Sequence, residues 1–140
     1  MDRWRKRHAA TGGSDSARYC YSVWLRHLSI LGSVGFRVAG AQVGELGPGD
    51  SIGIGLAGLL SGAKSYIGLD LVAFAGKANL LGIFQELVQM YLNYEAIPDH
   101  KEFPRVRPRL TSYTFPEHLI NYSDFDAKAG TIKDELSRGL

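Results

Sequence analysis

The stretch that decides the fold is residues 41–71, AQVGELGPGDSIGIGLAGLLSGAKSYIGLDL. It begins with a short apolar run that predicts a strand reaching Glu45, followed by a Gly-Pro-Gly-Asp-Ser turn at residues 47–51. Residues 52–62 are small and compatible with a helix, and residues 64–70 predict a second strand that ends on an acid. The order strand, glycine turn, helix, strand, acid is typical of an open parallel sheet that holds a nucleoside-bearing cofactor at the carboxyl ends of its strands.

Two glycines, Gly47 and Gly49, stand where the chain must leave a strand and enter a helix. Glycine adopts positive φ at no steric cost, and it brings no side chain toward a ligand. Pro48 between them fixes φ and stiffens the turn. The backbone N–H groups at the start of the next helix are expected to be unpaired, so that they can face a ligand. An ordinary strand-to-helix turn without a ligand explains the same glycines, because short G-x-G matches are common.

An acid closes each predicted strand. Glu45 ends the first strand just before the glycine turn, and Asp70 ends the second strand at about the distance downstream where a ribose-binding acid is expected. A carboxylate at Asp70 can accept hydrogen bonds from both ribose hydroxyls. The alternatives for Asp70 are a solvated acid at a strand end or the N-cap of the following helix.

The residues around the turn favour a cationic cofactor over a dinucleotide. The sixth position of the dinucleotide fingerprint G-x-G-x-x-G/A, counted from Gly47, is Ile52 rather than glycine. A pyrophosphate would also be repelled by Glu45 and Asp50, which carry charge of the same sign. S-adenosylmethionine has no phosphate and carries an ammonium and a sulfonium group, so acids near the turn suit it better than they suit NAD.

The turn resembles a known sequence motif. Residues 45–51 are similar to the first motif of class I S-adenosylmethionine-dependent methyltransferases, an acid, any residue and then G-x-G-x-G, with Ser51 in place of the third glycine. Asp70 matches the acid of the second motif. The wider runs that are similar to a bacterial subgroup of this family are Tyr21–Leu28, Glu45–Leu60 and Leu69–Val72. The resemblance implies an α/β fold with a Rossmann-like three-layer parallel sheet, and methyl transfer to an acceptor that it does not identify.

The resemblance also implies roles for individual residues. Backbone around Gly47 and Gly49 would contact the methionine part of S-adenosylmethionine, Glu45 would reach its amino group directly or through water, and Asp70 would bind the ribose hydroxyls. The cofactor-binding set implied in this way comprises Glu45, Gly47, Pro48, Gly49, Asp50, Asp70 and Leu71. It includes no catalytic residue and no metal ligand.

Composition sets limits on the class of protein. The 140 residues allow one domain at most, and a net charge of +2 is too small to argue for a nucleic acid or an anionic membrane as partner. No uninterrupted apolar stretch is long enough for a membrane span, and none follows the basic N-terminus as in a secretory signal. The single cysteine, Cys20, cannot form an internal disulfide, so we expect a cytoplasmic protein with a half-buried structural thiol rather than a nucleophile.

The first part of the chain divides into a tail and a helix. Residues 1–16 predict a flexible basic tail, and residues 17–140 a partial Rossmann-like methyltransferase domain. Residues 17–32 predict a helix, because apolar residues recur at a spacing of three and four along one stripe: Tyr21, Trp24, Leu25, Leu28 and Leu31. Arg26 and His27 fall off that stripe. The helix is expected to cover one face of the sheet; the alternative is a lid over the cofactor, with His27 or Tyr21 near the reacting methyl.

The second half of the chain carries weaker signals. Residues 79–94 predict a helix capped by Asn79, and a last helix is expected from Asp124 or Asp126 to Leu136. Prolines interrupt the segment after Ile97, which predicts an irregular connection. Its alternating arginines allow an edge strand or a contact with an anionic substrate as alternatives: Arg105, Arg107 and Arg109.

A doubly wound sheet has more strands than the two predicted here, so we expect a truncated domain. Two parallel strands alone would leave unpaired edges and an uncovered apolar face. Three functions follow: a methyltransferase or its cofactor-binding half, an inactive remnant or binding module without catalysis, and, less favoured, a fragment that binds NAD or another nucleotide. A completing chain or a homo-oligomer would cover the open edge of the sheet.

Overall fold

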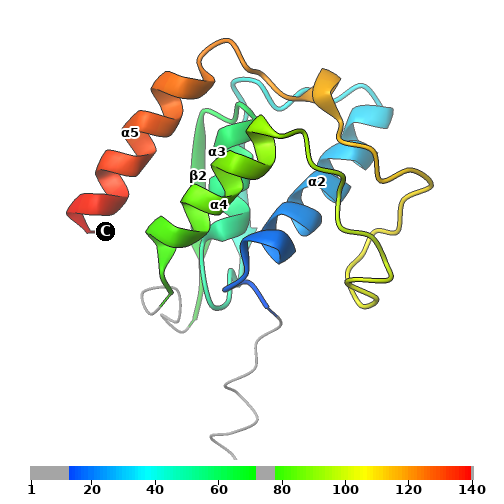
Figure 1. Ribbon diagram of the computed structural model, residues 1–140, viewed down its shortest axis with the longest axis horizontal. Coiled ribbons are helices and arrows are strands. Elements are labelled where there is room, and N and C mark those ends of the chain that lie inside the picture. Colours follow the sequence, from blue (N-terminus) through cyan, green and yellow to red (C-terminus); the bar gives the residue numbers. More distant parts are fainter. Residues whose placement is uncertain (1–12, 72–77, 140) are drawn as a thin grey trace, which may run out of the picture.

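The computed structural model describes residues 13–71 and 78–139. Within these ranges the chain forms four α-helices, one short 3-10 helix and a two-stranded parallel sheet, and it is therefore an α/β protein (Figure 1). The elements in chain order are α2 (Ala17–Ser33), β1 (Gln42–Leu46), α3 (Gly53–Ser61), β2 (Ser65–Leu69), α4 (Leu80–Leu92), η2 (Glu117–Leu119) and α5 (Phe125–Arg138). None of the helices in this part of the chain is long and apolar enough to cross a membrane.

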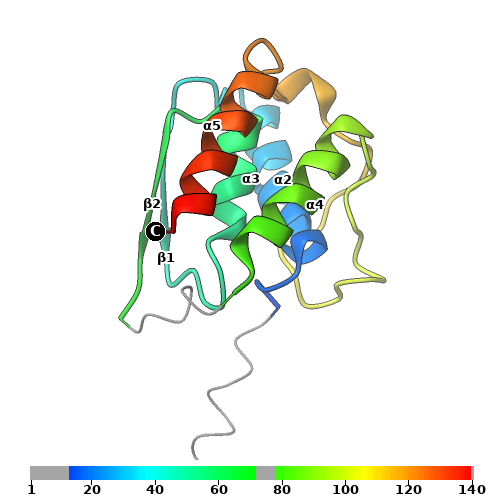
Figure 2. The same ribbon diagram turned by 60° about the vertical axis from the view of Figure 1, so that its left-hand side comes forward.

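The two strands are joined by α3 as a parallel crossover, as the sequence predicts. β1 pairs with β2 in a register that sets Val43 opposite Tyr66 and Leu46 opposite Leu69. Successive side chains of a strand point to opposite faces, so Val43, Glu45 and Tyr66 share one face. These three side chains are half-buried on the side of the helices, which all lie on one side of the strand pair (Figure 2).

The opposite face of the strand pair is exposed and apolar. Leu46, Ile67 and Leu69 keep 84%, 61% and 60% of their surface accessible. No third strand pairs with β1 or β2 within the described ranges. Large apolar side chains gathered on one exposed face mark a surface that another chain covers, or a liability for aggregation.

Small residues in α3 let the aromatic core approach it closely. A Cβ at Gly58 would lie 3.4 Å from the ring of Trp24 on α2. The indole N–H of Trp24 donates to Oγ of Ser61 over 2.7 Å, and the hydroxyl of Tyr91 on α4 donates to the carbonyl of Ala57 over 2.8 Å. These bonds satisfy polar groups that would otherwise be costly to bury, so they fix how α2, α3 and α4 pack.

Most helix predictions are confirmed within about two residues. Asn79 caps α4, where its side chain accepts a hydrogen bond from the N–H of Gly82. Two details of α2 were wrong. Leu31 was placed on the buried stripe but is 41% exposed, because the last turn of α2 runs past the core. Arg26 was placed off the stripe but is fully buried, because the segment after α4 folds over that side of the helix.

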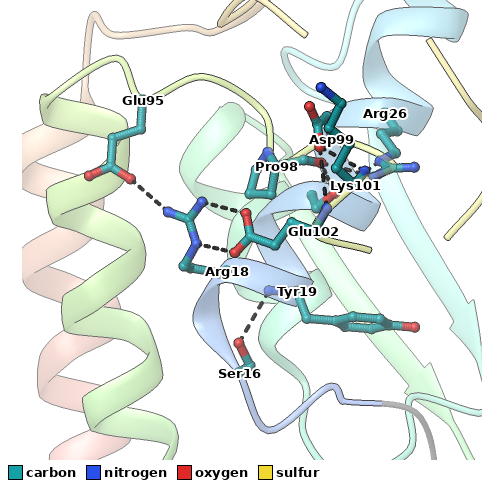
Figure 3. Close-up of polar contacts among 10 residues, drawn as sticks. Ser16, Arg18, Tyr19, Arg26, Glu95, Pro98, Asp99, Lys101 and Glu102 are labelled. Atoms are coloured by element: carbon teal, nitrogen blue, oxygen red, sulfur yellow. Dashed lines mark hydrogen bonds and ion pairs between the residues drawn. The ribbon is translucent and has the colours of Figure 1, made fainter. Parts of the chain in front are cut away.

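The proline-rich segment between residues 97 and 116 is irregular, as predicted, and the alternative of an edge strand is not found there. Two arginines of α2 hold it (Figure 3). Arg18 donates to both carboxylate oxygens of Glu102, over 2.7 and 2.8 Å, and lies 3.5 Å from Glu95. Arg26 donates to the carbonyl of Pro98 over 2.9 Å.

Candidate functional site

Parallel pairing brings the ends of the two strands together. The N–H of Gly47, just after β1, donates to the carbonyl of Leu69, the last residue of β2, over 2.8 Å. Glu45, the glycine turn and Asp70 therefore lie at one edge of the sheet. This edge is where ligands bind in open α/β sheets, because the chain leaves the strands there and opens a crevice.

The backbone of the turn requires its glycines. Gly47 has φ +68° and Gly49 has φ +77°, values that side chains larger than hydrogen disfavour. A Cβ at Gly47 would meet no atom within 4 Å, so the space beside it is open. Pro48 between them is buried, with its Cγ 3.4 Å from where a Cβ of Gly68 would stand. The turn is thus anchored by the buried Pro48, and its two glycines place no side chain beside it.

A hollow of about 470 Å³ lies between α2 and β1, within the size range of small-molecule sites. Its walls are mostly apolar, and Glu45 supplies a carboxylate. The lining comprises Val23, Trp24, His27, Leu31, Phe36, Gln42, Val43, Gly44, Glu45, Leu46, Ile54 and Tyr66. Asp70 and the turn glycines are not among these residues, so the hollow reaches the first acid and not the second.

The two side chains considered as neighbours of a reacting group are placed differently. His27 is exposed at the wall of the hollow, with Nδ1 2.8 Å from the carbonyl of Val23. Tyr21 is fully buried, and its hydroxyl donates to the carbonyl of Glu95 over 2.7 Å, away from the strand ends. Of the two, His27 is the one within the hollow.

Glu45 is the one carboxylate among the described residues that line the hollow. The hydroxyl of Tyr66 donates to its Oε2 over 2.7 Å. Burial raises the pKa of the Glu45 carboxyl, and the hydrogen bond from Tyr66 opposes that shift. The ring of Tyr66 lies over α3 so closely that a Cβ at Gly55 would stand 2.4 Å from it. Tyr66 was not among the predicted site residues; the strand register, which sets it opposite Val43 on the face of Glu45, is the signal that identifies it.

Replacing Glu45 by Gln is expected to stabilise the ligand-free protein at neutral pH. The change removes a charge that burial disfavours and keeps an oxygen that can accept from Tyr66. Folding raises the pKa of the Glu45 carboxyl, so the folded state favours the protonated side chain. The contribution of Glu45 to stability is therefore fully present below the pKa of the unfolded chain, and it is lost as pH rises through the pKa of the folded protein. The melting temperature of Glu45→Gln should exceed that of wild type at pH 7, and the gap should close near about pH 4. Circular dichroism melts across this range measure it; a variant less stable at pH 7 would contradict the assignment.

The expectation of unpaired N–H groups is wrong for the turn that leads into α3 and for the first residue of that helix. The hydroxyl of Ser14 accepts from the N–H of Asp50 over 2.8 Å and from the N–H of Ser51 over 3.3 Å. The N–H of Gly53 donates to Oγ of Ser51 over 3.0 Å. Ser14 was counted in the flexible tail but is 4% exposed, so the packed part of the chain extends at least to it. The basic residues of the tail lie outside the described residues.

The remaining predicted residues sit at the rim of the strand ends. Asp70 is exposed directly after β2, Leu71 is fully exposed, and Asp50 is partly exposed in the turn. Cys20 on α2 is fully buried, and burial raises the pKa of its thiol to about 12. A thiol protonated at neutral pH is a poor nucleophile, so Cys20 is a structural residue.

Taken together, the strand ends offer acids and an apolar hollow. Glu45 lies within the hollow, and Asp50 and Asp70 lie on the turn and the neighbouring strand end. This charge distribution favours a cationic ligand with an apolar body. The N–H groups of Asp50 and Ser51 already donate to Ser14, so the turn offers an anion few hydrogen-bond donors. Comparison of the chain with protein-family models, with curated proteins and with solved structures finds no match.

Proposed function

We propose that this chain is the cofactor-binding part of a Rossmann-like class I S-adenosylmethionine-dependent methyltransferase that acts on an acceptor not yet identified. The observation that carries the proposal is the glycine turn set between two strand-end acids, with Glu45 opening into an apolar hollow. The buried thiol of Cys20 and a reducing, cytoplasmic location are part of the same proposal.

The acids at the strand ends and the apolar lining of the hollow support S-adenosylmethionine as the ligand. Glu45 would hold its ammonium group, with Tyr66 fixing the carboxylate by the hydrogen bond to Oε2. Asp70 would accept from the ribose hydroxyls, and the open space beside Gly47 would admit the body of the ligand. The cofactor supplies an electrophilic methyl group. The chain's own contribution is to bind, to orient and to keep water from the hollow.

The alternative hypothesis, that the chain binds NAD or another nucleotide, has less support. A pyrophosphate would need N–H donors in the turn that leads into α3, and those of Asp50 and Ser51 already donate to Ser14. Calorimetric titration distinguishes the two hypotheses. The ligands are S-adenosylmethionine, its demethylated product S-adenosylhomocysteine, and NAD. We expect the first two to bind and NAD not to bind. Binding of NAD alone would end the methyltransferase proposal, and no binding by a folded sample would favour an inactive remnant.

Replacing Asp70 by Ala is expected to weaken binding of S-adenosylhomocysteine by about 1–3 kcal/mol, since a carboxylate that accepts from two hydroxyls is lost. Asp134→Ala is the matched control, because it removes an exposed acid from α5, which contributes no residue to the strand ends or to the lining of the hollow. Its dissociation constant should equal that of wild type. Equal dissociation constants for Asp70→Ala and Asp134→Ala would remove Asp70 from the site.

A second candidate is a binding module whose exposed sheet face is covered by another chain. The exposed apolar face of Leu46, Ile67 and Leu69 favours it, because a monomer rarely exposes such a face without a partner. We expect a second copy of the chain to cover this face, so that the two copies form a concentration-dependent dimer.

The change Ile67→Lys is expected to abolish that dimer, since it sets a charge on the covered face. Leu92→Lys is the matched control, because Leu92 is 47% exposed on α4, away from the sheet. Sedimentation velocity over a range of concentrations should show a dimer for wild type and the control, and a monomer for Ile67→Lys. A wild-type chain that stays monomeric throughout would exclude the homo-oligomer.

A further inference from the structure

Ser14 ties the start of α2 to the glycine turn through its hydroxyl and its carbonyl. Its hydroxyl accepts from the N–H groups of Asp50 and Ser51, 36 and 37 residues away. Its carbonyl accepts from the hydroxyl of Ser51 and from the thiol of Cys20, the latter over 3.2 Å. Ser14, Ser51 and Cys20 are all buried, so water has little access to the bonds among them, and the bond from Asp50 is partly buried.

The hydroxyl of Ser14 accepts from two N–H groups of the turn that an anion there would need as donors. A turn that leads from a strand into a helix presents successive N–H groups, and phosphates in nucleotide sites accept from such groups. Here two of them converge on one neutral oxygen. A phosphate oxygen would have to displace that hydroxyl, and it would also approach the carboxylate of Asp50.

We propose that Ser14 determines the ligand class of this turn: its hydroxyl holds the turn in place and closes the N–H groups of Asp50 and Ser51 to phosphate-bearing ligands. The part of this inference that concerns the choice of cofactor rests on the proposed function. The part that concerns the pairing of the two N–H groups with Ser14 is independent of the proposed function, because it involves only the chain itself. Ser14 is a positioning residue, and the ligand meets the turn and the acids rather than Ser14 itself.

Four proteins test the inference: Asp50→Asn, Ser14→Ala with Asp50→Asn, Cys20→Ala, and wild type. The Asp50→Asn background removes the repelling charge and keeps the N–H, so the comparison isolates the hydroxyl of Ser14. Each protein is titrated calorimetrically with inorganic pyrophosphate, ADP and S-adenosylhomocysteine. Amide hydrogen exchange of Asp50 and Ser51 is measured by NMR in the wild-type protein and in Cys20→Ala, which keeps the hydroxyl of Ser14.

The double variant is expected to bind pyrophosphate and ADP about tenfold or more tightly than Asp50→Asn, since two freed N–H donors become available to an anion. In wild type and in Cys20→Ala the amides of Asp50 and Ser51 should exchange slowly, and pyrophosphate should not bind. Equal pyrophosphate affinity of Asp50→Asn and the double variant would overturn the inference. Fast exchange of both amides in wild type would overturn it even if the double variant does not fold.

The S-adenosylhomocysteine titration separates this inference from the proposed function. Protected amides and a pyrophosphate-binding double variant, together with no binding of S-adenosylhomocysteine by wild type, would keep the role of Ser14 and end the methyltransferase proposal. Binding of S-adenosylhomocysteine by wild type with unprotected amides would do the reverse.

Discussion

Replacing Arg26 by Ala is expected to lower the free energy of unfolding by about 3–5 kcal/mol, from lost hydrogen bonds and an unfilled cavity. The Arg26 guanidinium is fully buried and donates to the carbonyls of Pro98 and Val106, each over 2.9 Å, and of Pro108 over 3.3 Å. It also lies over the ring of Tyr113, 5.2 Å from its centroid. Burial lowers the pKa of Arg26, but guanidinium groups stay charged in proteins. Arg26 therefore fastens the proline-rich segment to α2.

Two further variants make the test specific. Arg26→Lys keeps the charge but cannot reach several carbonyls with one planar group, so we expect it to recover less than half of the loss. Arg105→Ala removes an exposed arginine of the same segment, and its effect should stay within about 0.5 kcal/mol. Urea unfolding measures the three free energies. Arg26→Ala within about 1 kcal/mol of wild type would show that the carbonyls find other donors.

Replacing Gly53 by Ala is expected to destabilise the protein by about 1–3 kcal/mol through overpacking. A Cβ at Gly53 would stand 2.5 Å from the Sγ of Cys20 and 3.0 Å from the Oγ of Ser51. Both neighbours are buried and hydrogen-bonded, so neither can move aside without breaking the contacts of Ser14. The first turn of α2 can thus pack on the start of α3 only because this position carries no side chain.

The cause can be isolated with a double-mutant cycle. Adding Cys20→Ala removes the sulfur and should restore about 1 kcal/mol or more of the loss caused by Gly53→Ala. Gly130→Ala is the same substitution in α5, where a Cβ meets no atom within 4 Å, and it should stabilise by about 0.5–1 kcal/mol. Thermal unfolding of the five proteins gives the cycle and its control. Additive effects of Gly53→Ala and Cys20→Ala would refute the packing argument.

The helices and the glycine turn could be predicted because the residues that determine them are close together in the sequence. The spacing of apolar residues in α2 and α4 indicates helices whatever surrounds them, and Asn79 caps α4 through a bond only three residues long. The glycines of the turn and the acid at the end of each strand likewise indicate that the strand ends meet, and the parallel register brings them together.

The parts that were missed depend on contacts distant in sequence. Ser14 looks like part of a polar tail until its bonds to residues 36 and 37 positions away are known. Arg26 looks solvated until a segment more than 70 residues later folds over it. Tyr66 reaches Glu45 only through the strand register. A single sequence gives no measure of such contacts, because any polar residue can find a distant partner.

The bare outer face of the strand pair makes the state of this chain depend on the solvent around it. Sulfate salts strengthen the burial of apolar surface and would bring the faces of Leu46, Ile67 and Leu69 together, whereas mild detergent would mask them. Inside a cell, holdase chaperones that recognise extended apolar segments would compete for the same side chains. A chaperone or detergent molecule that binds this face first would therefore delay the proposed association of two copies.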